Sequence, residues 1–193
     1  MTPAGDDPTV FCATAQEWDA WLAANHETAA GVWLRIAKKG SGVESARYPE
    51  VLDSAIAYGW IDAVRHADDD THFLQRFTPR GPRSKWSKIN RAKAEKLIAE
   101  GRMTERGMRE VEKAKADGRW AAAYESQKNM PVPPDLQKEL DADPKAREFF
   151  DSLSSQNRYA ILYRLHDAKR PETRERRLKQ FVEMLKKRET LHP

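Results

Sequence analysis

The sequence predicts an α+β fold with a small, mainly antiparallel sheet packed with helices, followed by a compact all-helical module. Segments with the period-two alternation of strands all end before residue 80, whereas segments of helical period continue to the C-terminus. Between them, residues 129–135 (NMPVPPD) hold three prolines in four positions, which favours an extended spacer. We therefore expect an N-terminal α+β domain at residues 1–128, a proline-rich linker at 129–135 and a helical C-terminal module at 136–193.

The first expected elements are one helix and one strand. Residues 14–17 form a capping-box pattern, and Trp18, Trp21 and Leu22 follow at the spacing of one helix face. Residues 31–38 (GVWLRIAK) alternate in the manner of a half-buried strand, and the glycines of GSG at 40–42 favour a turn after it.

A second helix and a hairpin are expected next. Pro49 suits a first helical turn, and Gly59 suits the helix end. Residues 60–66 and 72–78 then predict two antiparallel strands joined by an acidic turn at 67–71, with Trp60 and Asp62 on one strand face.

The remaining segments predict helices. One begins at Ser84 or Ser87 and stops before Gly101, and the next runs from Thr104 to Gly118. Beyond the linker, helices are expected to open at Asp143-Pro144, at Ser154 or Ser155, and at Pro171.

Charge and cysteine content restrict the class of protein. Residues 1–70 carry five basic and twelve acidic side chains, whereas residues 80–193 carry 28 basic and 18 acidic ones. The lone Cys12, expected in a frayed N-terminal segment, cannot form an internal disulfide. No stretch approaches the ~20 apolar residues of a membrane span, and the N-terminus has no signal-like pattern. We expect a cytoplasmic protein.

The segment TPRGPRSKWSKIN at residues 78–90 is the most unusual in the chain, because prolines stiffen a run that is rich in cations. If strand and helix pack together, its side chains and those of the strand before it line one concave site. Indoles supply flat walls, an Arg grips an anion, and Ser and Asn fix orientation. The predicted ligand-binding residues are Trp60, Asp62, Arg80, Ser84, Trp86, Ser87 and Asn90.

The structural alternative is that both tryptophans are core anchors, that Ser84 or Ser87 is an N-cap, and that Asp62 pairs with an Arg. We expect no metal and no cofactor, although His66, Asp68, Asp69, Asp70 and His72 mix donor types that suit a divalent ion. A turn of solvated acids explains this cluster better.

Five segments of the chain together resemble one known family. They are EWDAWL (17–22), GVWLRIAKK (31–39), YGWID (58–62), FTPRGPRSKWSKIN (77–90) and AKRPETRERR (168–177). The family that they resemble is the YdeI/OmpD-associated, or bacteriocin-protection, family. This resemblance implies a link to resistance against peptide antimicrobials, and the C-terminal segment resembles the short helical module that defines the family.

The function we expect is sequestration of a peptide or small-molecule antimicrobial in the Trp/Arg/Ser/Asn-lined site. One alternative is nucleic-acid binding, since residues 80–96 hold seven basic side chains and one acidic side chain. Another is an enzyme with Asp62 as general base and Arg80 or Asn90 stabilising an anion. The sequence indicates no catalytic nucleophile and leaves the oligomeric state open.

Overall fold

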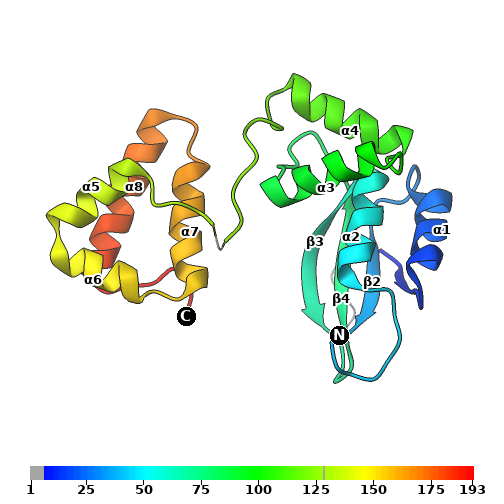
Figure 1. Cartoon of the computed structure of the whole chain (residues 1–193). Helices are drawn as coiled ribbons and strands as arrows, with labels where there is room; N and C mark the ends of the chain where they lie inside the picture. The colour runs from blue at the N-terminus through cyan, green and yellow to red at the C-terminus, as the bar shows by residue number, and fades with distance from the viewer. Residues whose placement is uncertain (1–6, 128) are drawn as a thin grey trace. The chain divides into compact units, whose positions relative to one another are not determined.

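The computed structural model describes residues 7–127 and 129–193 and confirms the α+β fold (Figure 1). The chain divides into two compact units, residues 1–123 and 124–193. The exact limits of the expected domains and linker stay predictions, and residue 128, the expected end of the first domain, lies outside the described residues. Helix α5 begins at Pro134, so its first turn overlaps the end of the predicted linker.

The N-terminal unit contains a sheet in the order β1-β2-β4-β3. The expected hairpin, β3–β4, is antiparallel, as is the β2–β4 pair, whereas β1 runs parallel to β2. Strand β1 was not predicted, because three residues are too few to show an alternating pattern. The strands are β1 (Thr9–Phe11), β2 (Val32–Ala37), β3 (Trp60–Ala67) and β4 (His72–Pro79).

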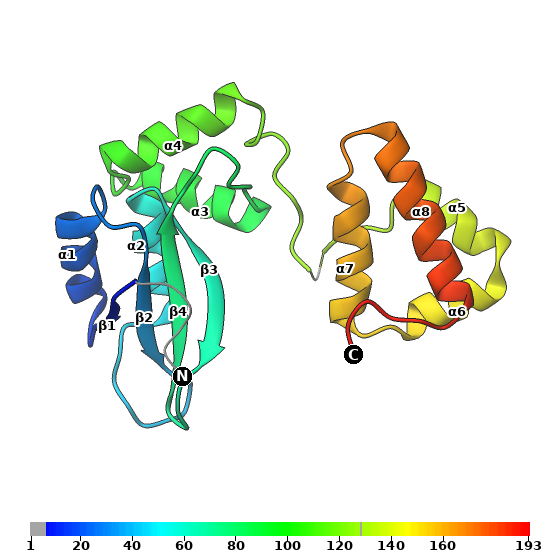
Figure 2. The same ribbon diagram turned by 180° about the vertical axis from the view of Figure 1, so that it is seen from behind.

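Four helices of the N-terminal unit pack around one face and one end of this sheet. Helix α2 lies across the sheet and contacts α1, α3 and α4, and Figure 2 shows that α1–α4 leave the opposite sheet face of this unit uncovered. The predicted caps Thr14 and Thr104 accept hydrogen bonds from the backbone of the first turns of α1 and α4. The helices are α1 (Ala15–Asn25), α2 (Tyr48–Ala57), α3 (Lys88–Ala99) and α4 (Glu105–Ala116).

The core of this unit lies between α1, α2 and the sheet. Trp18 is fully buried, and its Nε1 donates to the carbonyl of Val51 at 3.0 Å, which ties α1 to α2. Cys12 is also buried, and its carbonyl accepts from the Ala46 amide at 3.1 Å. The expectation that Cys12 lies in a frayed segment was therefore wrong, because β1 anchors the preceding residues to the sheet.

Edge strand β3 carries a bulge. Asp62 pairs with Phe77 and Arg65 with Gln75, so β3 has one more residue than β4 in this interval. The buried amide of Gln75 donates to the carbonyl of Val64 at 3.2 Å and to that of Ala63 at 3.5 Å. The side chain of the partner strand thus supplies bonds that the regular ladder loses at the bulge.

The C-terminal unit is helical throughout its regular structure, as expected. Asp143 and Ser154 cap two of its helices, which settles the choice left open between Ser154 and Ser155. Asn157 is buried and binds the C-terminal residues, while Arg174 pairs with Asp135 at 2.6 Å. The helices are α5 (Pro134–Ala142), α6 (Pro144–Ser152), α7 (Ser155–His166) and α8 (Pro171–Lys186).

Candidate functional site

A cavity of about 850 Å³ lies beside the loop that joins β2 to α2. This β2–α2 loop, residues 38–47, forms most of the wall. Ile36 and Ala37 contribute the end of β2, Tyr48 and Pro49 the start of α2, and the β3–β4 hairpin adds the remaining side. The cavity therefore belongs entirely to the N-terminal unit.

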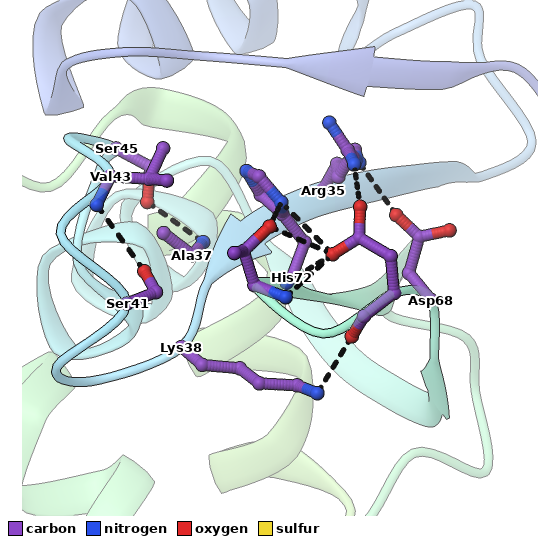
Figure 3. Close-up of polar contacts among 10 residues, drawn as sticks. Arg35, Ala37, Lys38, Ser41, Val43, Ser45, Asp68 and His72 are labelled. Atoms are coloured by element: carbon purple, nitrogen blue, oxygen red, sulfur yellow. Dashed lines mark hydrogen bonds and ion pairs between the residues drawn. The ribbon is translucent and has the colours of Figure 1, made fainter.

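Side-chain and backbone hydrogen bonds hold the β2–α2 loop in place. The hydroxyl of Ser45 accepts from the Ala37 amide at 2.9 Å and donates to the carbonyl of Ala46, as Figure 3 shows in part. Gly40 and Gly42 adopt φ values of +83° and +75°, which L side chains rarely adopt. The expected GSG turn is thus confirmed, and its two glycines supply backbone conformations in the cavity wall that other residues rarely adopt.

Cations predominate in the charged lining of the cavity. Among the residues that the structure describes, Lys38, Lys39, Arg47 and Arg65 line it, with Glu44 as the single acidic side chain. The Nζ of Lys38 donates to the backbone carbonyl of Asp69 at 2.7 Å (Figure 3). Because that acceptor is neutral, the bond fixes the ammonium group without neutralising it.

Tyr48 connects this cavity to one predicted site residue. Its hydroxyl donates to Oδ2 of Asp62 at 2.8 Å. Burial, and secondarily this bond, raise the pKa of Tyr48 above its usual value, so the phenol remains protonated at neutral pH. Asp62 consequently has a fixed donor, and its role as a general base stays a prediction.

Internal hydrogen bonds and ion pairs hold the acidic turn. Arg35 pairs with Asp68 and Asp69 (Figure 3), and Oδ1 of Asp69 accepts from the backbone amides of Thr71 and His72. The Thr71 bonds lower the pKa of Asp69. Among the described residues, no group of three or more His, Cys, Asp or Glu side chains is placed to hold a metal ion.

Both tryptophans of the predicted site are buried in the core. Trp60 is fully buried, and its Nε1 donates to the carbonyl of His26 at 3.2 Å. Trp86 is 1% exposed and meets Trp120 edge-on, with ring centroids 4.9 Å apart. Neither ring presents an accessible face, so a ligand would reach them only if neighbouring side chains moved.

Two other predicted residues, Arg80 and Ser84, lie in the segment before α3. The guanidinium of Arg80 stacks on Trp86 and donates to the carbonyl of Lys85 at 3.2 Å. The hydroxyl of Ser84 accepts from the Gly81 amide at 2.9 Å, and its carbonyl accepts from Arg119. These contacts hold the segment before α3 in a folded turn, on which Arg83 and Lys85 are exposed.

Ser87 is the N-cap of α3, because its hydroxyl accepts from the Asn90 amide at 3.1 Å. The structure thereby decides between Ser84 and Ser87. None of the seven predicted residues is among the described residues that line the cavity, and Asp62 is linked to the lining through Tyr48. Ligand binding by the seven residues stays a prediction.

The sequence analysis did not predict the cavity. The segment KKGSG at 38–42, with two cations beside two glycines, is the sequence feature that could have indicated it.

These features define a two-unit protein in which an α+β unit with a cationic cavity precedes a helical module. Residues 10–110 match the family model described as "Domain of unknown function (DUF8412)", and the chain belongs to this family. Residues 129–188 match the model "Bacteriocin-protection, YdeI or OmpD-Associated". The resemblance expected over nearly the whole chain is thus supported for its C-terminal part only.

Two further comparisons and one structural finding complete this description. No curated protein and no solved structure gave a match to the chain. Within residues 7–127 and 129–193, no helix has the length and apolar character needed to cross a bilayer.

Proposed function

We propose that this protein binds a peptide or small-molecule antimicrobial in the β2–α2 cavity and protects the cell by sequestering it, in the cytoplasm. The cavity is the observation that carries the binding function. The description of the family matched by residues 129–188 supplies the biological context of protection. Binding and protection are therefore separate parts of the proposal with separate support.

The size and walls of the cavity suit a ligand of drug size. Its volume of about 850 Å³ falls within the range of roughly 300–1,000 Å³ that is typical of small-molecule sites. Ile36, Val43 and Phe73 provide apolar surface, and the loop hydrogen bonds hold the opening in place without a ligand. An ordered site favours binding, because less conformational entropy is lost.

Local chemistry favours binding over covalent catalysis in this cavity. The Ser45 hydroxyl both accepts and donates hydrogen bonds within the loop. A nucleophilic serine instead needs a neighbouring base to take its proton. The hydroxyl of Ser45 is thus used to hold the wall of the cavity.

The direct test combines titration with a variant in which the cavity is filled. Isothermal titration and thermal-shift assays would cover peptide and small-molecule antibiotics, using the intact chain and Ser41→Trp. We expect at least one compound to bind the intact chain and to lose affinity for Ser41→Trp. Ala92→Trp, at an exposed position of α3 outside the cavity lining, is the matched control and should bind normally.

The same variants test protection in cells. Cells expressing the intact chain or Ala92→Trp should tolerate a bound antimicrobial better than cells expressing Ser41→Trp. A panel without any binder, or equal binding and protection by the filled variant, would overturn the proposal.

Ligand binding by the seven predicted site residues, at a position outside the cavity, stays a separate prediction. Loss of ligand affinity in Asn90→Ala, with full affinity in Ser41→Trp, would move the site from the cavity to α3. Nucleic-acid binding is distinguished by affinity for a DNA duplex that falls steeply as salt rises.

A further inference from the structure

We propose that the ligand of the β2–α2 cavity is an organic anion, whose carboxylate, phosphate or sulfonate group is bound by Lys39, Arg47 and Arg65. This inference rests on the proposed binding function and specifies the chemistry of the ligand. Four cations and one carboxylate of residues 7–127 line the cavity, so the described lining has an excess of three positive charges. Such an excess in a hollow attracts anions and strengthens their binding.

The charges of these three cations remain available. Within the described part of the chain, Lys39, Arg47 and Arg65 form no ion pair with a carboxylate. By contrast, Lys93 in the same unit is paired with Asp53. A bound anion would therefore gain charge-assisted hydrogen bonds without displacing an internal partner.

Nearby carboxylates have partners of their own. Asp68 and Asp69 pair with Arg35, and Asp62 accepts from Tyr48. The carboxylates of Asp62, Asp68 and Asp69 thus bind to other side chains of the protein. In the described part of the lining, Glu44 is then the only acidic side chain to oppose an incoming anion.

The start of α2 adds to the positive potential of the cavity. Arg47 is the N-cap residue, and its side chain makes no capping hydrogen bond. Tyr48 and Pro49, which begin the helix, are part of the cavity wall. The first amides of a helix carry partial positive charge, so this end favours an anion in the space that the cations already surround.

Arg65 and Phe73 together offer a ligand both a cation and an apolar surface. The guanidinium carbon of Arg65 lies 3.6 Å from the centroid of the Phe73 ring. Stacking orients the planar guanidinium and leaves its edge able to donate two parallel bonds to an anion. We infer that the ligand joins an anionic group to an aromatic or aliphatic body.

A pair of fluorescent probes separates the contribution of the ligand's negative charge from that of its aromatic body. 1-Anilinonaphthalene-8-sulfonate carries a sulfonate, whereas N-phenyl-1-naphthylamine has the same aromatic body without charge. Both are titrated into the intact chain, Lys39→Gln, Arg47→Gln and the double variant. Lys96→Gln, which changes an exposed cation of α3 outside the lining, is the charge-matched control.

We expect each single cavity variant to weaken binding of the sulfonate probe roughly tenfold, the effect of losing one charge-assisted contact, and the double variant to weaken it further. Binding of the uncharged probe should stay within about twofold, and Lys96→Gln should affect neither probe. Thermal unfolding of each variant verifies that it folds. Higher salt should weaken only the sulfonate probe.

Competition separates the sources of the anionic group. Benzoate, phenyl phosphate and uncharged benzamide are each added to the sulfonate-probe complex. Displacement by benzoate indicates a carboxylate ligand, displacement by phenyl phosphate a phosphorylated one, and either supports the inference.

Two results would overturn it. One is the absence of sulfonate-probe binding, and the other is equal loss or equal retention of both probes in the cavity variants. If the uncharged probe still binds and Ser41→Trp abolishes that binding, the cavity remains a binding site. The charge inference then fails while the proposed function stands.

Discussion

The guanidinium carbon of Arg80 lies 3.6 Å from the ring centroid of Trp86, and both side chains are buried. The sequence predicts Arg80 as a ligand-binding residue of the basic segment. In the fold, the same cation covers an indole that faces the core. The charge and the planar face of its guanidinium group thus contact another side chain of the protein.

Replacing Arg80 with Met should consequently cost stability. A desolvated cation–π pair is worth about 2 kcal/mol, so urea unfolding should show a loss of that order. Arg83→Met, at an exposed position in the same segment, should change stability by less than about 0.5 kcal/mol. Unchanged stability of Arg80→Met, together with lost ligand affinity, would instead support the predicted binding role.

Ser87 should be the serine that stabilises α3. Because its hydroxyl accepts from the Asn90 amide, Ser87→Ala should lower the free energy of unfolding by about 1 kcal/mol. Ser87→Asp keeps an acceptor at the same position and should preserve most of the stability. Chemical denaturation of the two variants provides the comparison, and equal losses in both would contradict a capping role.

Asp69 should make the stability of the hairpin sensitive to acid. Hydrogen bonds from Thr71 lower the pKa of Asp69 in the folded chain, so the unfolded chain takes up a proton first as pH falls. The stabilisation is complete above the ordinary aspartate pKa of about 3.9 and is lost as pH drops below it. Thermal unfolding between about pH 6 and pH 2 should therefore depend less on pH in Asp69→Asn.

Asp70→Asn is the matched control for this experiment, because Asp70 is a neighbouring exposed carboxylate of the same turn. It should leave the pH profile close to that of the intact chain. Equal flattening by both substitutions would show that general charge, and not the Asp69 bonds, causes the dependence.

Asn157 should hold the C-terminal residues against the helical unit. Its Oδ1 accepts from the amides of Leu191 and His192 at 3.0 and 2.9 Å, and its Nδ2 donates to the His192 carbonyl at 3.1 Å. Asn157→Ala leaves these groups without their partner and should cost about 1–3 kcal/mol. Limited proteolysis should then remove the last residues faster.

Gln156→Ala changes an exposed neighbour on the same helix and should leave proteolysis unaffected. If the tail of Asn157→Ala stays as resistant as that of the intact chain, apolar packing of Leu191 holds it instead.

Much of the fold was predictable because its signals are local. Thr14, Ser87 and Thr104 each bind backbone amides within three residues, and Gly59 and Gly101 end helices through their own positive φ. These interactions require no knowledge of distant parts of the chain.

The cavity and strand β1 depend on contacts between distant residues. Strand β1 is defined by its pairing with β2, and the cavity by the position of Arg65 and Phe73 beside the β2–α2 loop. Trp60 and Trp86 were predicted to line a ligand site, whereas both are buried in the core. Periodicity alone does not distinguish a side chain that faces a pocket from one that fills a core.

The bulge in β3 affects how this chain can meet its own copies. A regular edge strand offers evenly spaced donors and acceptors to any second strand, which makes it a template for polymerisation. At Ala63 and Val64 that spacing is broken, and the amide of Gln75 holds the two carbonyls. A neighbouring copy would therefore find no uninterrupted ladder along β3, and we expect concentrated solutions to resist growth of sheet-paired fibres from this edge.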